Sequence, residues 1–171
     1  MNEFGEVLEN ISLSKFTSLK IGGICKYLIM PHNINELKAL LKYLNHNQIK
    51  YYFLGNGTNV ILDDSYFDGV VIKLDNFKNI NYEDNKVTVQ SGVSLGYLVN
   101  NMLNHGFTNL SFASMIPGLV GASVVGNAGA YSHELMEYVD KVTVLDKDFN
   151  DDTKLNSSHD LNISLDCKNA N

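Results

Sequence analysis

The sequence predicts a mixed α+β fold made of two small α/β lobes, residues 1–75 and residues 76–171. In the first lobe a helical pattern stands directly between two strands, and in the second an alternating strand at 87–90 runs into another helical pattern. Strands and helices that alternate along a chain are typical of α/β units. A length of 171 residues and an apolar content of 44% allow one domain, or two lobes that share a ligand.

The first lobe is expected to contain a helix between two parallel strands. A strand at 25–30 ends at Pro31, and Asn33 with Glu36 forms a capping box ahead of apolar residues at helical spacing. A strand at 49–54 follows at once, so we expect it to pair in parallel with strand 25–30. Further strands are expected at 60–62 and 70–74, and residues 1–12 give only a weak indication of a short helix.

The second lobe opens with the strand at 87–90. Ser94 is expected to cap a helix over 95–103, and Gly106 stands where a left-handed residue commonly ends a helix. The sequence assigns no role to residues 147–171 as a whole. Strands are expected at 139–145 and, by strict alternation, at 161–167, with an acidic solvated loop at 146–152.

Residues 116–131 form the most informative segment of the chain. From Gly118 to Ala130, eight of the thirteen residues are Gly, Ala or Ser. Small residues let the backbone approach another surface and leave N–H groups free to face an anion or a flat polar ring. Pro117 precedes the run, where its fixed φ suits a first helical turn. The segment therefore predicts a ligand held against the backbone.

A second glycine-rich loop lies at residues 55–59, after a strand of large residues. Its amides, with Thr58 and Asn59, suit a pyrophosphate. The loop lacks the dinucleotide fingerprint, because Val60 stands where a third glycine is required, and it lacks the Lys-Ser/Thr of a nucleoside-triphosphate loop. Taken alone, Gly-Asn-Gly favours a tight hairpin turn. A ligand shared with residues 116–131 is the other interpretation.

Composition excludes several functional classes. A formal net charge of −6 argues against a nucleic-acid or anionic-membrane surface. Cys25, Cys167 and the five histidines show no metal-ligand spacing, so we expect free thiols and no metal site. No apolar run approaches the roughly 18 residues that a membrane helix needs, and no secretory leader begins the sequence. We therefore expect a cytoplasmic protein.

The two glycine-rich segments give the chain a family resemblance. It resembles the flavin-binding part of the UDP-N-acetylenolpyruvoylglucosamine reductases, also called UDP-N-acetylmuramate dehydrogenases, which are flavoproteins of the vanillyl-alcohol-oxidase type. Ala122 and Ser132 depart from the family, which usually has glycine at both positions. The resemblance spans about residues 13–146 and rests on seven blocks in the family's order: 17–23, Pro31 with 36–37, 54–59, 69–72, 91–93, 116–121 and 127–131.

The resemblance implies a two-lobed FAD-binding domain, with NADPH as the hydride donor. The implied reaction passes a hydride to the flavin and on to the enolpyruvyl group of a UDP-sugar, which yields UDP-N-acetylmuramate for peptidoglycan synthesis. Neither glycine-rich segment contains the His or Cys that covalent attachment usually needs, so we expect non-covalent FAD. The implied cofactor-binding residues are Gly55, Asn56, Gly57, Thr58, Asn59, Ile116, Pro117, Gly118, Gly121, Ala122, Asn127, Gly129 and Tyr131.

No catalytic residue is carried over from the family. The family places a serine acid and a glutamate in a separate substrate domain and uses an arginine of a Tyr-Arg-x-Ser motif. After Asp166 and Cys167 this sequence has neither Tyr nor Arg, and all thirteen of its basic residues are lysine. We therefore expect the substrate domain to be absent and the chain to be inactive alone. A non-catalytic flavin-binding module, or another FAD oxidoreductase of the same fold, remains an alternative.

Two further sites have a functional and a plain interpretation. Tyr131 either lies against the flavin or substrate, or is a packed core tyrosine. His133 and Glu134 have the composition of an acid–base pair, but a solvated helix start is the favoured interpretation.

Overall fold

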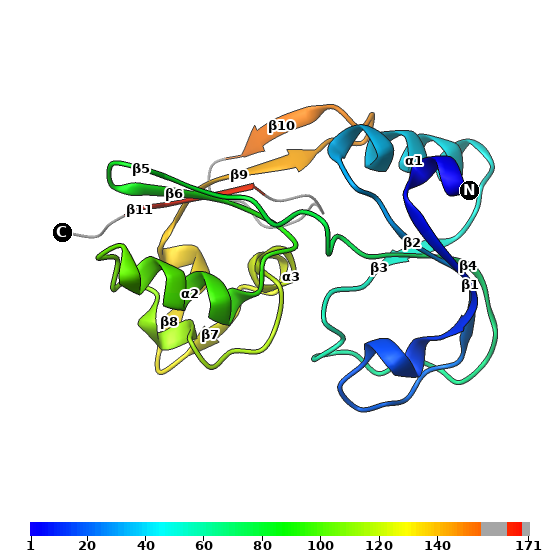
Figure 1. Cartoon of the computed structure of the whole chain (residues 1–171), viewed down its shortest axis with the longest axis horizontal. Coiled ribbons are helices and arrows are strands. Elements are labelled where there is room, and N and C mark those ends of the chain that lie inside the picture. Colours follow the sequence, from blue (N-terminus) through cyan, green and yellow to red (C-terminus); the bar gives the residue numbers. More distant parts are fainter. Residues whose placement is uncertain (155–163, 169–171) are drawn as a thin grey trace. The chain divides into compact units, whose positions relative to one another are not determined.

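The chain divides into two compact units, and the computed structural model describes residues 1–154 and 164–168 (Figure 1). Unit 1 comprises Met1–Phe77 and unit 2 comprises Lys78–Asn171. Their assignment as the first and second FAD-binding lobes remains a prediction.

A four-stranded sheet forms the centre of unit 1, with the order β1-β2-β4-β3. β1 is antiparallel to β2, whereas β2, β4 and β3 are mutually parallel. Val70, Val71 and Ile72 of β4 are all buried, as expected for a central strand that is covered on both faces. The elements are η1 (Asn2–Phe4), β1 (Glu6–Ser12), η2 (Leu13–Phe16), β2 (Ile24–Met30), α1 (Ile34–His46), β3 (Tyr51–Phe53) and β4 (Phe67–Ile72).

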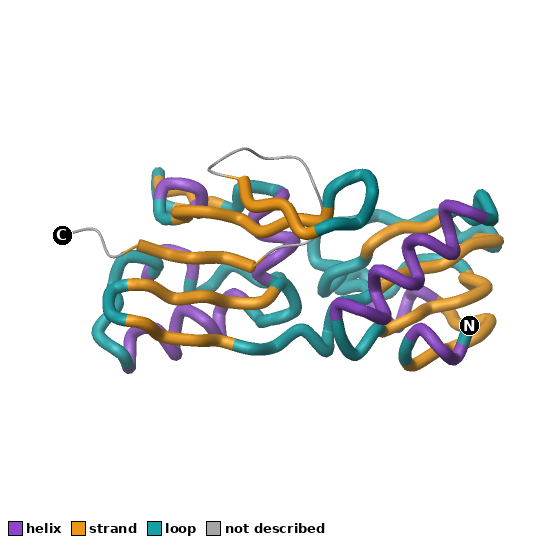
Figure 2. Tube along the Cα trace, turned by 90° about the horizontal axis from the view of Figure 1, so that it is seen from above, coloured by secondary structure: helices purple, strands orange, loops and turns teal. Residues whose placement is uncertain are grey.

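Helix α1 follows β2, as the sequence predicts, and lies across the sheet of unit 1 (Figure 2). The Asn33 carboxamide oxygen accepts the N–H groups of Asn35 and Glu36 at 3.0 and 3.1 Å, which caps the first turn. Leu37 and Leu40, on the apolar stripe of the helix, are fully buried. Local capping and apolar periodicity therefore specify this helix.

Unit 1 differs from the sequence-based expectations at four places. β2 and β3 are parallel, but β4 lies between them, so they do not pair with each other. Residues 60–62 are not a strand, and the 55–59 loop is not a hairpin turn, because β3 and β4 run parallel. β1, which the sequence did not indicate, pairs with β2 and forms an edge of the sheet. Pairing between distant strands, which local patterns do not encode, decides each case.

Unit 2 is built on a five-stranded antiparallel sheet with the order β10-β9-β11-β6-β5. Helices α2 and α3 lie on one face of this sheet (Figure 1). Val87 and Val89 are fully buried while Thr88 between them is half-buried, which is the alternation of a strand with one covered face. The elements are β5 (Ile80–Glu83), β6 (Lys86–Gln90), α2 (Leu95–Asn104), η3 (Ser111–Ala113), α3 (Val120–Val125), β7 (Gly129–Ala130), β8 (His133–Glu134), η4 (Leu135–Glu137), β9 (Val139–Leu145), β10 (Asp151–Lys154) and β11 (Ser164–Lys168).

Most local expectations for unit 2 are confirmed. Ser94 caps α2 by accepting the Tyr97 N–H at 3.5 Å, and Gly106 follows the helix with a φ of +85°. The expected strand at 139–145 is β9. The acidic loop is shorter than expected, because β10 begins at Asp151. The alternating strand is present as β11, and the expected positions 161–163 lie outside the described residues.

Candidate functional site

The 55–59 loop lies at the carboxyl edge of the parallel strands of unit 1. β3 ends at Phe53, shortly before the loop, and β4 ends at Ile72. Because β3 and β4 are parallel neighbours, both strands end at the same edge of the sheet. Open α/β sheets commonly bind ligands outside this edge. The loop is therefore placed where a ligand site is expected.

Gly57 packs closely against its own chain. Its φ of +62° lies in the left-handed region, and an added Cβ would meet the Phe16 carbonyl and lie 2.8 Å from the Thr17 α-carbon. Its carbonyl oxygen accepts the Ser18 N–H at 2.9 Å and the Ser18 hydroxyl at 3.2 Å. The close approach that this glycine permits is thus to residues of unit 1, and a side chain here would disturb folding directly.

The same loop presents backbone hydrogen-bond donors that no described residue accepts. Within the described part of the chain, no acceptor receives the N–H of Gly55, Asn56, Gly57 or Asn59. The side chains of Asn56 and Asn59 are exposed. Adjacent backbone N–H groups in a turn form sites that attract anions. The predicted cofactor role of these residues remains a prediction, but their donors have the chemistry that it needs.

Lys73 is a residue at this edge that the sequence analysis missed. It directly follows the buried end of β4 and is only 5% exposed. Its ammonium nitrogen donates to the Gly55 carbonyl oxygen at 2.8 Å. The one signal in the sequence is that a charged residue directly follows the apolar run 70–72. A lysine at such a position ordinarily lies in a solvated loop, so the pattern does not indicate that Lys73 is buried.

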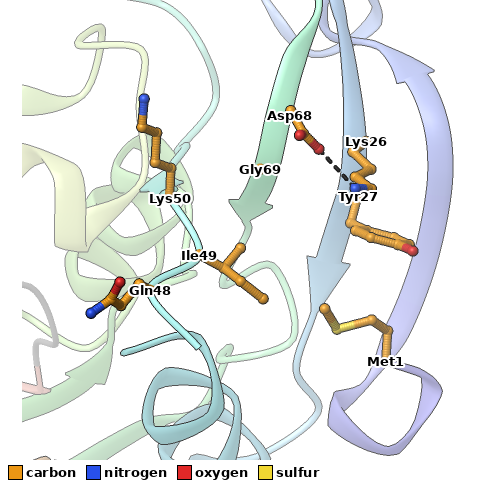
Figure 3. Close-up of a pocket in the computed structure, with 8 residues that line it drawn as sticks. All are labelled: Met1, Lys26, Tyr27, Gln48, Ile49, Lys50, Asp68 and Gly69. Atoms are coloured by element: carbon orange, nitrogen blue, oxygen red, sulfur yellow. Dashed lines mark hydrogen bonds and ion pairs between the residues drawn. The ribbon is translucent and has the colours of Figure 1, made fainter. Parts of the chain in front are cut away.

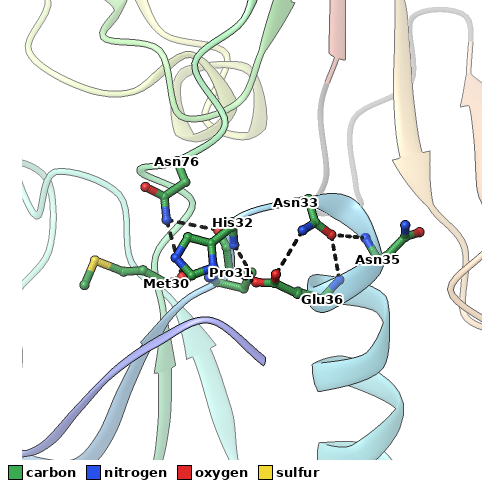
Figure 4. A network of polar contacts seen from close by, with 7 residues as sticks. All are labelled: Met30, Pro31, His32, Asn33, Asn35, Glu36 and Asn76. Atoms are coloured by element: carbon green, nitrogen blue, oxygen red, sulfur yellow. Dashed lines mark hydrogen bonds and ion pairs between the residues drawn. The ribbon is translucent and has the colours of Figure 1, made fainter. Parts of the chain in front are cut away.

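The end of β2 at this edge is fixed by a polar network (Figure 4). Asn76 donates from its amide nitrogen to the Pro31 carbonyl oxygen at 3.2 Å, which ties the segment after β4 to the turn before α1. Glu36 accepts the His32 N–H at 2.8 Å and the Asn33 amide at 2.9 Å. The hydrogen bond from the His32 backbone lowers the pKa of the Glu36 carboxyl. These groups satisfy one another, so the start of α1 is capped by its own residues.

In unit 2 the glycine-rich segment is attached to the turn after β6. The N–H of Val120 donates to the Val93 carbonyl oxygen at 2.8 Å, and the N–H of Gly121 donates to the Ser91 carbonyl oxygen at 2.9 Å. The expectation that the amides of this run are free for a ligand is therefore wrong for Gly121. Small residues here allow α3 to pack against its own unit.

Other amides of the segment do remain available. Among the described residues, no acceptor receives the N–H of Gly118, Leu119 or Ala122. Ala122 is exposed, Gly118 is half-buried and Ile116 packs at the border of the core. The N–H groups of unit 2 that remain available to a ligand therefore belong to the turn before α3 and to the first turn of α3.

Asn127 has its side chain engaged within unit 2. Its amide nitrogen donates to Glu134 Oε2 at 2.6 Å, and its carbonyl oxygen accepts the Met136 N–H at 3.1 Å. Gly129 pairs with Glu134 across the β7–β8 hairpin. An added Cβ on Gly129 would lie 2.7 Å from the His133 carbonyl oxygen. Both residues therefore have a structural role, whatever their part in cofactor binding.

The β7–β8 hairpin closes through Tyr131 and Ser132. Their φ values of +54° and +63° are those of a type I′ turn, which glycine and asparagine normally occupy. Tyr131 is 83% exposed, so its interpretation as a packed core residue is wrong. The family usually has glycine at position 132, and glycine is sterically preferred there, so Ser132 departs from the family at a position of unfavourable φ.

His133 and Glu134 lie in β8 and are exposed. Both are solvated, as expected, but they form a strand, and only Glu134 caps the short helix η4, so the expected helix start holds for Glu134 alone. His133 Nδ1 lies 3.2 Å from Glu137 Oε2 and 3.2 Å from the Tyr138 hydroxyl. The partner of His133 is therefore Glu137, one turn further on, and not its neighbour in sequence.

Two cavities in unit 1 contain none of the predicted cofactor residues. The larger, of about 650 Å³, includes Leu54 and Val60, which flank the 55–59 loop. The smaller, of about 390 Å³, lies where β3 and β4 begin, at the opposite edge from the loop (Figure 3). There Lys26 and Asp68 form an ion pair of 2.8 Å, which raises the pKa of Lys26.

The described residues contain neither a cluster of metal-binding side chains nor a membrane-spanning helix. They contain no group of three or more His, Cys, Asp or Glu side chains that could hold a metal ion. They also contain no helix with the length and apolar character needed to cross a membrane.

The predicted cofactor-binding residues are divided between unit 1 and unit 2, so a ligand shared by the two glycine-rich segments remains a prediction.

Comparison with known proteins gives the family. Residues 25–148 match the family described as FAD binding domain. A UDP-N-acetylenolpyruvoylglucosamine reductase of Caldanaerobacter subterraneus subsp. tengcongensis is 40% identical over 146 residues, which cover 85% of this chain and 48% of that protein. A second, of Clostridium novyi, is 36% identical over 82% of this chain and 46% of its own length. The chain thus spans about half the length of the curated relatives it matches.

Solved structures show the fold. The crystal structure of a UDP-N-acetylenolpyruvylglucosamine reductase from Thermus caldophilus superposes with a TM-score of 0.73 at 24% identity, over 95% of this chain and 60% of that one. The predicted fold, a two-lobed α+β FAD-binding domain of the vanillyl-alcohol-oxidase type, is confirmed. The chain belongs to the FAD-binding domain family and, within it, is similar to the UDP-N-acetylenolpyruvoylglucosamine reductases.

Proposed function

We propose that this chain is the FAD-binding portion of an NADPH-dependent reductase that converts UDP-N-acetylglucosamine enolpyruvate to UDP-N-acetylmuramate. The identity of 40% to a reductase over most of the chain supports the proposal. Because about half of that relative's length is matched, the complete activity, the UDP-sugar substrate and NADPH are all part of the proposal.

One structural observation carries the cofactor assignment. The N–H groups of Gly55, Asn56, Gly57 and Asn59 have no acceptor among the described residues, and they lie at the carboxyl edge of a parallel sheet. The diphosphate of FAD is an anion that such donors bind. The residues present therefore fit the group, and the buried Lys73 ammonium, which is paired with Asp75, holds the Gly55 carbonyl of this loop.

The protein's own residues would bind and orient the cofactor. The 55–59 loop would hold the diphosphate, and the N–H groups of Gly118, Leu119 and Ala122 would face polar atoms of the ligand. Bound FAD would supply the chemistry of accepting a hydride from one donor and releasing it to another molecule. No described residue is assigned as the proton donor, and the 171 residues contain no arginine to stabilise an enolate.

The proposal places the protein in the cytoplasm, where it would act in peptidoglycan synthesis and hence in cell-wall biogenesis, cell shape and cell division. Its partners would be FAD and the UDP-sugar, with no nucleic acid and no membrane. The acidic net charge of −6 supports the absence of a nucleic-acid partner.

The first test is cofactor binding by the purified chain. We expect titration with FAD to give a saturable complex and acid precipitation to release all of the flavin into the supernatant. Flavin that stays with the pellet would contradict non-covalent attachment. Absence of saturable binding would contradict the proposed function itself.

The second test is turnover by these 171 residues. We expect slow NADPH oxidation at most, and no UDP-N-acetylmuramate, because the family's arginine, serine and glutamate have no counterpart that we identify here. A positioned general acid alone typically contributes about 10²–10⁴-fold. Product formed at about 1 s⁻¹ or faster would show that the catalytic groups are present after all.

A further inference from the structure

Lys73 has an unusual environment for a lysine. It is 5% exposed, and its ammonium nitrogen lies 2.8 Å from the Gly55 carbonyl oxygen and 3.3 Å from Asp75 Oδ1. The ammonium also lies 5.9 Å from the centre of the Phe16 ring. All four residues belong to unit 1. Burial of a charge is costly unless partners compensate it, so these contacts need an explanation.

The neighbouring carboxylate pairs with the ammonium without a hydrogen bond. Asp75 Oδ1 is buried, yet it accepts no hydrogen bond from any described residue, because its approach to Lys73 lacks hydrogen-bond geometry. Among the described residues, the hydrogen bond of the ammonium goes to the neutral Gly55 carbonyl. The ion pair has little net charge, so the contact by which Lys73 acts on the 55–59 loop is this hydrogen bond.

The hydrogen bond to Gly55 also orients the loop. The described chain has no cis peptide bond, and in a trans peptide the carbonyl oxygen and the following N–H point in opposite directions. By holding the Gly55 oxygen, Lys73 turns the Asn56 N–H away from the interior. That N–H is one of the four in the loop without an acceptor.

We propose that Lys73 is a positioning residue for the diphosphate of the nucleotide cofactor. It fixes the Gly55–Asn56 peptide with the N–H outward, and its charge lies behind the anion. Asp75 opposes this effect, because its carboxylate repels the same anion. The inference rests on the proposed FAD-binding function and selects the diphosphate, because four backbone N–H donors of the loop have no acceptor among the described residues and an ammonium lies beside them.

Affinities for FAD and riboflavin test the proposal, because riboflavin lacks the phosphates. In Lys73→Met we expect the affinity for FAD to fall at least about tenfold, the scale of one charge-assisted hydrogen bond, and the affinity for riboflavin to stay within about twofold. Asp75→Asn should bind FAD as tightly as the wild type or more tightly. The control Lys42→Met removes an equal charge from an exposed position of α1 and should leave both affinities unchanged.

The outcomes separate the inference from the proposed function. A wild-type chain that binds no FAD contradicts the proposed function and the inference with it. If the wild type binds FAD, equal losses for FAD and riboflavin in Lys73→Met overturn the inference alone. Weaker FAD binding by Asp75→Asn would also overturn it, since a purely structural ion pair predicts that loss. Asp75 is partly exposed, so this second variant keeps the proposal testable if Lys73→Met does not fold.

Discussion

The backbones of Gly121 and Ser91 are in close contact. The Gly121 N–H donates to the Ser91 carbonyl oxygen at 2.9 Å, and a Cβ added to Gly121 would lie 2.7 Å from the Ser91 Cβ. Helix α3 can therefore approach the turn after β6 only because residue 121 has no side chain. One glycine of the segment expected to face a ligand thus has a packing role inside unit 2.

Gly121→Ala should destabilise unit 2. The added methyl group meets a side-chain carbon and backbone atoms of Ser91, which cannot move freely, so we expect a loss of about 1–3 kcal/mol in the free energy of unfolding. Urea denaturation of the ligand-free chain measures this loss of stability. Gly126→Ala is the matched control, because a Cβ there would lie 3.4 Å from its nearest neighbour, the Ala122 carbonyl oxygen. Equal effects from the two variants would contradict the packing role.

Ser132→Gly should stabilise the protein. Ser132 has a φ of +63°, a conformation that costs a residue with a side chain roughly 1–2 kcal/mol, and glycine removes that cost while it loses more entropy on folding. We expect a net gain of about 0.5–1 kcal/mol, measured by thermal or urea unfolding. Ser111→Gly, in η3 with negative φ, should instead lower stability. If Ser132→Gly left stability unchanged or lowered it, residue 132 would not keep this strained conformation in solution.

Asn127→Ala should loosen the segment between α3 and η4. The substitution removes the hydrogen bonds to Glu134 and Met136 and replaces a residue type that tolerates the φ of +43°. We expect a loss of about 1–2 kcal/mol, again from urea denaturation. Asn100→Ala, at an exposed position of α2, should change stability by less than about 0.5 kcal/mol. Similar losses of stability in both variants would contradict a stabilising role for the Asn127 hydrogen bonds to Glu134 and Met136.

Glu36→Gln should make the stability of unit 1 less dependent on pH. The folded-state pKa of Glu36 is below its ordinary value of 4.5, chiefly because its carboxylate accepts the His32 N–H. The stabilisation is therefore present above pH 4.5 and is lost as the pH falls through the lower folded-state value. Urea unfolding should show a deficit of about 0.3–1 kcal/mol at pH 7 that becomes smaller at pH 3. A constant deficit would exclude titration of this carboxyl as the cause.

Local signals predicted the elements that local chemistry specifies. Asn33 and Ser94 cap their helices as the sequence indicates, and Gly106 follows α2 with positive φ. Each depends on groups within a few residues, so the pattern is complete in the sequence. The family resemblance likewise came from ordered short blocks, and the match over residues 25–148 agrees with it.

Long-range pairing was not predictable in the same way. The position of β4 between β2 and β3, and the pairing of β1 with β2, involve strands far apart in the chain. The segment 60–62 has the apolar composition of a strand, yet it pairs with no described strand of the sheet. A segment with strand propensity is able to pair, but which strand it pairs with depends on the arrangement of all strands in the sheet.

The helix caps, the glycine-rich segments and the family can be predicted from the amino-acid order, because each depends on neighbouring residues. Which glycines pack against their own chain, and which loop amides stay available, depends on contacts between distant residues. Gly57 and Gly121 are alike in sequence to ligand-facing glycines, but Phe16 and Ser91 approach them in space. The role of Lys73 was hidden for the same reason, since its contact with Gly55 joins residues that are brought together only by the parallel pairing of β3 and β4.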